Sequence, residues 1–345
     1  MPTSSFILAV FFAALGGCER PTSEVTGLTF APEPGPDPEP TELVMDLVAE
    51  SSPYLDDGFG SSVAASADTV WVGAPHGVVG RVFRQTNMGV ELLVEGEGRL
   101  GSHLAHTAAG LWVGAPLGGS GAGLVVDQDG EPIASGFLGT GIVVSSVGGG
   151  TYGHASGIVT SDGRTVTTAD RPGSVAEADG TLGVGMPRGP IVLTAAGSEL
   201  RRATIGDEAG FALAAVDWDA DGIEDWVVGA PGSGTVTVYG HDQLRPLHAW
   251  SAPGRFGAAI AVCDLDRNGT KDLLIGAPFD GQTGSVSWYP NLADSATPLA
   301  VEWPAAARAV GTAIACEGDR VYVGAPGDAV HRGMLLTITV TAAAE

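Results

Sequence analysis

The chain has 345 residues and a formal net charge of −24 at pH 7, from 16 Lys and Arg against 40 Asp and Glu. Such a chain lacks the basic surface that phosphate backbones require, so we expect no nucleic-acid partner. With 53 glycines, 22 prolines and 44% hydrophobic residues, the composition excludes global disorder and is typical of an all-β protein rich in turns.

The N-terminus has the pattern of a bacterial export signal. Residues 6–15 form an apolar run that is too short to span a bilayer as a helix. The run leads into Leu15-Gly16-Gly17-Cys18, which resembles a lipobox, so we predict a signal peptide over residues 1–17 and lipidation of Cys18. Because residues 1–5 contain no Lys or Arg, an ordinary secretory signal is the alternative. Lipidation predicts a protein anchored in the cell envelope, at the outer membrane or cell surface.

Residues 18–41 are predicted to be a lipid-anchored linker rich in proline and acidic residues. Within it, residues 31–40 carry five prolines at alternate positions. Proline fixes φ and removes a hydrogen-bond donor, so this stretch favours an extended polyproline II conformation. The linker would hold a globular domain away from a membrane; a disordered leader is the alternative.

A repeat organises residues 42–345. Gly-Ala-Pro follows a short apolar strand five times, and two degenerate copies fill the gap between the second and the third. The first residues of these seven copies, the marker glycines, recur on average about every 42 residues, which is the size of one propeller blade. They are Gly73, Gly114, Gly153, Gly185, Gly229, Gly276 and Gly324. A Trp or Tyr precedes four of them and is predicted to be a core residue: Trp71, Trp112, Trp226 and Tyr322.

Each well-formed copy also has an upstream glycine after a bulky residue, as in Phe59-Gly60 and Phe256-Gly257. Phe-Gly followed by Gly-Ala-Pro resembles the FG-GAP repeat of the integrin α-subunit N-terminal propeller and its bacterial relatives. The third and fourth copies are recognisable mainly by position, and the fifth has Ala209-Gly210 in place of Phe-Gly. The resemblance implies an all-β, seven-bladed β-propeller.

The two ends of the repeat region suggest how the ring closes. Residues 42–48 resemble residues 90–95, a strand that precedes the second repeat, and the chain ends shortly after the apolar strand 334–340. We predict that the N-terminal strand supplies the missing outer strand of the seventh blade, which would leave no open blade edge in the ring. A loose N-terminal strand is the alternative.

The fifth and sixth repeats carry acidic insertions, residues 217–225 and 264–272. Oxygen ligands at positions 1, 3, 5 and 9, a glycine at position 6 and a carbonyl at position 7 favour Ca²⁺. No Glu stands at position 12, so these are not EF-hands; the calcium loops of integrin-like propellers are similar. Metal-free Asp-rich turns are the alternative. The predicted ligands are Asp217, Asp219, Asp221, Ile223, Asp225, Asp264, Asp266, Asn268, Thr270 and Asp272.

Two cysteines remain in the repeat region, Cys263 and Cys316. Cys263 lies six residues after Gly257 and Cys316 five after Gly311, which places them on opposite faces of equivalent strands. On this reasoning we expect two buried thiols, with a disulfide as the alternative.

These features favour a non-catalytic, calcium-binding propeller of the cell envelope that binds a protein or a glycan through loops on one rim, as a monomer. The sequence contains neither a Gly-x-Ser-x-Gly elbow nor a P-loop. A secreted hydrolase or lyase with a site in the propeller channel is the alternative, and a purely structural envelope role is a third possibility, since fold alone does not assign function.

Overall fold

The computed structural model divides the chain into two units, Met1–Thr41 and Glu42–Glu345. It describes residues 43–342 except 56, 67–68, 122, 136–142, 146–149, 155–156, 161–164, 169–171, 187–190, 196–197, 204–206, 242–243, 293–298, 301 and 329–331. The predicted signal peptide, the linker and Cys18 lie outside the described residues. No helix among the described residues is long and apolar enough to cross a membrane.

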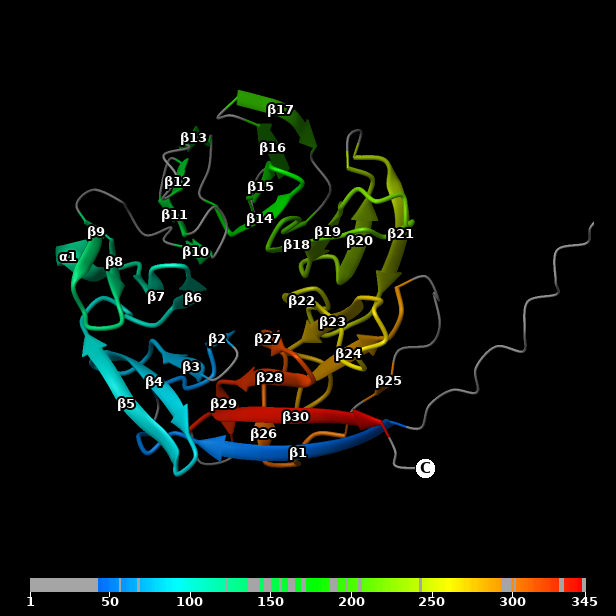
Figure 1. Cartoon of the computed structure of the whole chain (residues 1–345). Helices are drawn as coiled ribbons and strands as arrows, with labels where there is room; N and C mark the ends of the chain where they lie inside the picture. Colours follow the sequence, from blue (N-terminus) through cyan, green and yellow to red (C-terminus); the bar gives the residue numbers. More distant parts are fainter. Residues whose placement is uncertain are drawn as a thin grey trace, which may run out of the picture. The chain divides into compact units, whose positions relative to one another are not determined.

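Six four-stranded sheets are each built from strands that follow one another in the chain (Figure 1). The first three are sheet 1, with β2 (Ser62–Ser66), β3 (Thr69–Ala74), β4 (Gly80–Thr86) and β5 (Gly89–Gly96); sheet 2, with β6 (His103–Thr107), β7 (Gly110–Ala115), β8 (Leu124–Asp127) and β9 (Pro132–Ser135); and sheet 3, with β10 (Val143–Ser145), β11 (Thr151–His154), β12 (Gly157–Thr160) and β13 (Thr165–Thr167). A short helix, α1 (Gly118–Gly121), lies between β7 and β8.

The next three sheets follow the same plan. They are sheet 4, with β14 (Ser174–Ala178), β15 (Thr181–Gly185), β16 (Ile191–Ala195) and β17 (Ser198–Ala203); sheet 5, with β18 (Ala212–Val216), β19 (Asp225–Ala230), β20 (Thr235–Tyr239) and β21 (Pro246–Ser251); and sheet 6, with β22 (Ala259–Cys263), β23 (Asp272–Ala277), β24 (Ser285–Tyr289) and β25 (Leu299–Ala300). Within each sheet, successive strands pair antiparallel, as β18 and β19 do from Ala212 opposite Gly229 to Val216 opposite Asp225.

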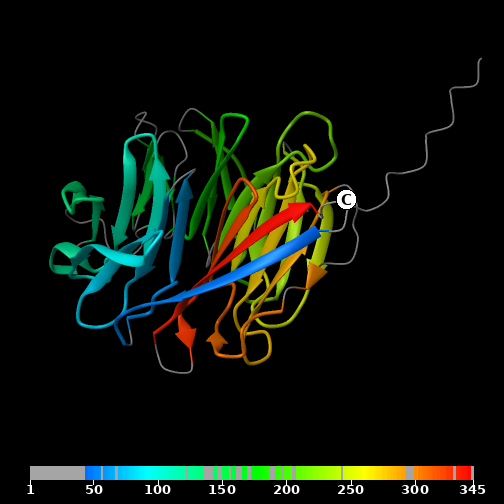
Figure 2. The ribbon, with the colours of Figure 1, turned by 60° about the horizontal axis from the view of Figure 1, so that its bottom comes forward.

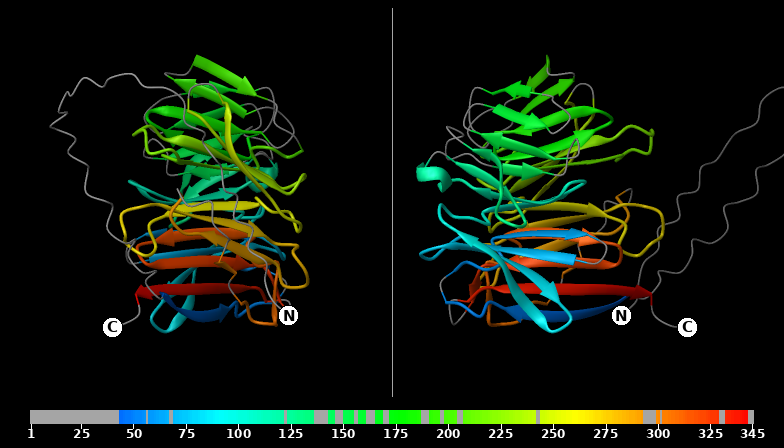
Figure 3. Two further views of the ribbon diagram at one scale, coloured as in Figure 1. Left: turned by 90° about the vertical axis from the view of Figure 1, so that its right-hand side faces the viewer. Right: turned by 60° about the vertical axis from the view of Figure 1, so that its left-hand side comes forward.

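One further four-stranded sheet, here called the joining sheet, combines strands from both ends of the second unit. Its order is β1 (Leu43–Ser51), β30 (Met334–Ala342), β28 (Arg320–Ala325) and β27 (Ala313–Glu317). β1 pairs antiparallel with β30 along its whole length, from Leu43 opposite Ala342 to Ser51 opposite Met334. Figures 2 and 3 show the blue β1 beside the red β30. A small two-stranded sheet pairs β26 (Ala307–Arg308) with β29 (Gly327–Asp328).

The second unit is therefore an all-β β-propeller, with its sheets arranged around a common centre (Figure 1). Apolar side chains fill the space between neighbouring sheets. The aromatic residues that precede the marker glycines are all buried, which confirms their prediction as core residues: Trp71, Trp112, Trp226 and Tyr322. One cluster joins sheet 6 to the joining sheet through buried residues such as Leu274 and Val321.

The glycine pairs of the repeat have a shared steric cause. A Cβ atom on marker glycine Gly276 would overlap the carbonyl oxygen of Gly311, the upstream glycine of the following repeat. The same overlap would occur between Gly324 and Gly60, which belong to the last and the first repeats. The strand that carries a marker glycine thus approaches the segment just before the first strand of the neighbouring sheet so closely that a side chain cannot fit between them. Gly73, Gly185 and Gly229 make the same contact with the upstream glycine of the following repeat.

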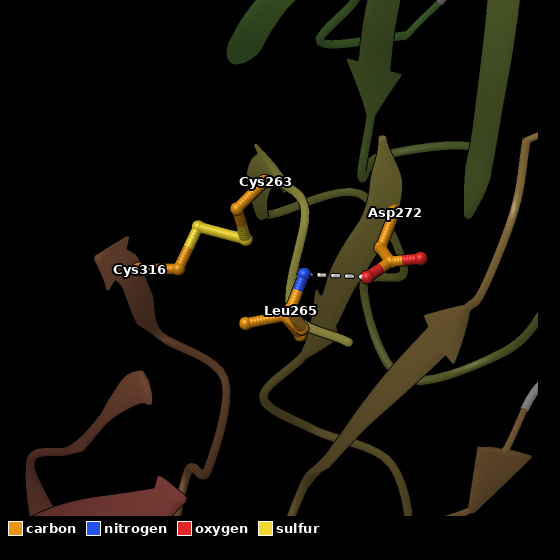
Figure 4. The surroundings of a disulfide bond; sticks show 4 residues. All are labelled: Cys263, Leu265, Asp272 and Cys316. Carbon is orange, nitrogen blue, oxygen red and sulfur yellow. Dashed lines mark hydrogen bonds between the residues drawn. A yellow bond between two sulfur atoms is a disulfide. The ribbon is translucent and has the colours of Figure 1, made fainter. Parts of the chain in front are cut away.

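The structure corrects the prediction of two free thiols. Cys263 ends β22 in sheet 6, Cys316 lies on β27 in the joining sheet, and the two form a disulfide with their Cα atoms 6.4 Å apart (Figure 4). The prediction assumed that two cysteines on opposite faces of equivalent strands cannot form a disulfide, which is true only of residues within one sheet. In a propeller, neighbouring sheets face each other, so residues that meet between them must point from opposite faces of their own sheets. The positions of Cys263 and Cys316 on opposite faces of equivalent strands therefore permit the disulfide.

Candidate calcium loops

The two acidic insertions connect the first and second strands of adjacent sheets. The first loop, residues 217–225, links β18 to β19, and the second loop, residues 264–272, links β22 to β23. Position 9 of each loop is already the first residue of the second strand: Asp225 pairs with Val216, and Asp272 pairs with Cys263. In both loops, the residue just before position 1 therefore pairs antiparallel with position 9, and this pairing holds the two ends of the loop close together.

The backbone turns in the same way in both loops. Position 4 has a left-handed φ of 58° in each, although it is Ala220 in one loop and Arg267 in the other. Position 6 also has a positive φ, 86° at Gly222 and 90° at Gly269, where glycine carries no steric penalty. The two loops differ in sequence at most positions, yet their backbones form the same tight turn. The side chains at the odd positions therefore start from equivalent backbone positions in both loops.

The first loop brings three of the predicted ligands together. Asp217, Asp219 and Asp221 each have a carboxylate oxygen within 4.8 Å of the others. Backbone N–H groups of the loop already bind two of them: Asp217 accepts from Asp221 at 3.1 Å and from Gly222 at 3.0 Å, and Asp221 accepts from Ile223 at 2.8 Å. Three carboxylates this close repel one another when ionised. A divalent cation would relieve that repulsion, and the oxygen-only donor set fits a hard one.

The second loop repeats the backbone contacts with one amide in place of a carboxylate. Asp264 Oδ2 accepts from the N–H of Gly269 at 3.0 Å, and Asn268 Oδ1 accepts from the N–H of Thr270 at 2.7 Å. The amide nitrogen of Asn268 donates to Asp266 Oδ2 at 2.8 Å. By contrast, Asp264 Oδ1 is buried with no hydrogen-bond partner. A buried carboxylate oxygen without a partner carries a desolvation cost that a cation would offset, so this residue set also fits a hard cation.

Position 9 has a structural role that the sequence reasoning missed. Both oxygens of Asp225 accept backbone N–H groups, from Trp218 at 3.3 Å and from His241 at 3.0 Å. Asp272 does the same with Leu265 at 2.8 Å, drawn in Figure 4, and with Asn291 at 3.0 Å. Each carboxylate therefore ties position 2 of its loop to the segment after the third strand. Asp225 does not belong to the group of three clustered carboxylates in its loop.

Burial raises the pKa of Asp225 and of Asp272 above the usual range of aspartate. Neighbouring carboxylates of the same loop raise both pKa values further, while the backbone N–H donors lower them. A cation bound in the loop would lower the pKa of Asp225 and of Asp272, opposite to the effect of the neighbouring carboxylates, and would favour the ionised form of both residues.

His241 and Asn291 are the residues that the sequence analysis did not find. Each follows by two positions a tyrosine that ends the third strand of its sheet, Tyr239 in β20 and Tyr289 in β24. This common spacing was visible in the sequence, but the two residues differ in chemistry. Each donates its backbone N–H to position 9, and each also contacts its loop through its side chain: His241 Nδ1 lies 2.9 Å from the carbonyl oxygen of Glu224, and Asn291 Oδ1 accepts from the amide nitrogen of Asn268 at 2.6 Å. A search for conserved donor types could not detect them.

Comparison with known proteins agrees with the fold and with the repeat. Residues 217–275, from the start of the first loop to near the end of β23, match the family model of the FG-GAP-like repeat. This confirms the resemblance to FG-GAP repeats: the chain is a β-propeller protein that contains an FG-GAP-like repeat, and both acidic loops lie in the matched segment. No curated protein matches the chain.

Solved structures share the fold at low sequence identity. The WD40 β-propeller domain of Doa1 aligns with a TM-score of 0.62 at 13% identity, over 84% of this chain and 97% of that one. A chain of the mitotic checkpoint complex aligns with a TM-score of 0.61 at 14% identity, over 84% and 93%. Virginiamycin B lyase from Staphylococcus aureus aligns with a TM-score of 0.59 at 12% identity, over 86% and 99%. Identities this low establish similarity of fold alone.

Proposed function

We propose that this protein is a calcium-binding, non-catalytic binding module whose propeller presents a protein- or glycan-binding rim. The observation that carries the proposal is the pair of acidic loops, which share one backbone turn and two hydrogen bonds, from the N–H at position 6 to the side chain at position 1 and from the N–H at position 7 to the side chain at position 5. Bound Ca²⁺ would neutralise the loop carboxylates and stabilise the folded blades. The ligands would be Asp217, Asp219, Asp221 and Ile223 in the first loop and Asp264, Asp266, Asn268 and Thr270 in the second, with Asp225 and Asp272 supporting them.

The propeller would have seven blades, with the joining sheet as the seventh. The pairing of β1 with β30 supports this count, because it adds an outer strand to the three that the C-terminal segment provides. The close approach of Gly324 to Gly60 would then be the contact between the seventh and first blades. Closure by the N-terminal strand would make the stability of the ring depend on both ends of the repeat region.

Anchoring in the cell envelope is the third part of the proposal. Cys18 would carry the lipid, and residues 18–41 would separate the propeller from the membrane. The support is the lipobox-like sequence that ends at this cysteine, together with the alternating prolines that follow. A propeller displayed in this way would reach a protein or a glycan outside its own membrane.

Calorimetry on the full chain tests the calcium assignment. We expect two Ca²⁺ ions per chain and weak replacement by Mg²⁺, which prefers a tighter octahedral shell. At a free Ca²⁺ concentration one hundred times Kd, each site would stabilise the fold by about 2.7 kcal/mol, so chelation should lower Tm. Asp219→Ala combined with Asp266→Ala should abolish this response. Asp129→Ala, which removes an exposed carboxylate in the turn between β8 and β9, is the control and should keep it.

The assignment would be refuted by fewer than two bound ions in the wild type, or by a full calcium response in the double variant. A glycan array probed with and without chelator measures binding at the rim. A hydrolase and lyase screen addresses the enzymatic alternative: calcium-dependent turnover that a point variant abolishes would contradict a non-catalytic role.

A further inference from the structure

The Cys263–Cys316 disulfide lies directly beside the second acidic loop. Cys263 is the last residue of β22, and the next residue, Asp264, is position 1 of the loop. Cys316 belongs to β27, so the bond crosses from sheet 6 to the joining sheet (Figure 4). Asp264, a predicted calcium ligand, is therefore linked covalently to the joining sheet through one peptide bond and the disulfide.

An ion pair adds a second link between the second acidic loop and the joining sheet. Arg267 Nη2, in the middle of the second loop, lies 3.0 Å from Asp319 Oδ2 in the turn between β27 and β28. That turn is itself held to β30, because the carbonyl of Asp319 accepts the N–H of Val340 at 2.8 Å. The ion pair is exposed and is worth little alone. The disulfide thus adds a covalent link from the start of the loop to the joining sheet, beside the pairing of Cys263 with Asp272 within sheet 6.

The first loop provides an internal comparison. Val216 precedes Asp217 just as Cys263 precedes Asp264, and it is a buried core residue without a covalent partner. The link from this loop to the preceding sheet consists of hydrogen bonds, such as the 2.8 Å bond from the N–H of Glu224 to Asp179 Oδ2. One molecule thus contains two equivalent loops, of which only the second lies beside a disulfide.

We propose that the Cys263–Cys316 disulfide is a redox-sensitive element that sets the calcium affinity of the second loop and leaves the first loop unchanged. The proposal rests on the calcium assignment above. The oxidised bond fixes the backbone next to Asp264, whose Oδ1 is buried and has no hydrogen-bond partner. After reduction, the end of β22 is held against β27 by packing and no longer by a covalent bond, and calcium binding must then restrict the additional motion of this residue. Ordering about one residue corresponds to roughly a tenfold weaker Kd.

The chemistry needs an external dithiol. Its thiolate attacks one sulfur of the disulfide, and Cys316 is the more accessible of the two residues because Cys263 is only 8% exposed. The S–S bond breaks, a mixed disulfide forms, and the second thiol of the reagent releases the protein thiol. Both cysteines end as thiols, and the reagent ends as its own disulfide, so two electrons and two protons pass from the reagent to the protein.

Two variants of the full chain separate the loops. Asp219→Ala removes calcium binding to the first loop, so that binding to the second loop is measured alone. Asp266→Ala removes calcium binding to the second loop, so that binding to the first loop is measured alone. Calcium binding to each is measured by calorimetry before and after treatment with dithiothreitol, while mass spectrometry of alkylated protein counts the free thiols and circular dichroism monitors the fold. We expect Kd to rise about tenfold in Asp219→Ala on reduction and to stay within about twofold in Asp266→Ala.

Replacing both cysteines tests the same idea without a reductant. Cys263→Val reproduces the valine that precedes the first loop, and with Cys316→Ala it removes the bond. In the Asp219→Ala background this protein should have the weaker Kd from the start and should not respond to dithiothreitol. Equal changes in both loops, or none in the second, would overturn the proposal and leave the calcium assignment intact. Absence of calcium binding in both oxidised variants would instead overturn the calcium assignment, and the redox proposal with it.

Discussion

The contact between Gly324 and Gly60 offers a sharp test of how the ring is packed. In Gly324→Ala, the new Cβ would lie 2.0 Å from the carbonyl oxygen of Gly60, whereas ordinary contacts begin at 3.4 Å. The atom that must move is backbone, so β28 of the joining sheet and the segment just before β2 would have to separate by more than an ångström. Overpacking of this kind costs about 1–3 kcal/mol, and we expect a loss near the upper end because no side chain can rotate away.

Part of that loss is offset, because alanine restricts the unfolded chain and so favours folding by about 0.4–1 kcal/mol. The expected net destabilisation is about 2 kcal/mol. For a domain of about 300 residues it should lower Tm by roughly 3 °C. Thermal and denaturant unfolding measure it, with calcium held at a constant concentration so that ligand binding does not alter the comparison.

Gly240→Ala is the matched control for this substitution. Gly240 directly follows β20, and a Cβ there would have its nearest neighbour, the carbonyl oxygen of Arg245, at 3.8 Å. Its stability should therefore stay within about 0.5 kcal/mol of the wild type or rise slightly. If Gly324→Ala were as stable as Gly240→Ala, the steric explanation of the glycine repeat would be wrong.

Two further predictions concern the ends of the propeller and the anchor. Deleting residues 43–51 removes β1 and exposes an edge of β30; since each lost ladder hydrogen bond contributes about 1 kcal/mol, Tm and soluble yield should both fall, and an unchanged Tm would argue against closure by this strand. Cys18→Ala should abolish incorporation of labelled palmitate and partition into detergent, whereas continued membrane association of the variant would contradict lipid anchoring at this residue.

Local pattern was enough to predict the class of fold and the curl of the two acidic loops. The spacing of the marker glycines indicates where a strand of one sheet contacts the segment before the first strand of the next, because only glycine tolerates the distance between Gly276 and Gly311. The turns of the two loops are similarly local: positions 4 and 6 adopt left-handed φ, and the side-chain oxygens at positions 1 and 5 accept N–H groups a few residues away. Such interactions depend on a short stretch of chain, so they can be recognised before any tertiary structure is known.

Three features were decided by tertiary structure alone. The disulfide between Cys263 and Cys316 depends on two sheets facing each other, which reverses the inference drawn from strand parity. Asp225 and Asp272 bind the backbone of segments that follow another strand, so their role in bracing the loops is set by sheet packing rather than by loop spacing. The isolation of Asp264 Oδ1 is likewise a result of burial, because a carboxylate oxygen loses its water only when surrounding strands pack around it.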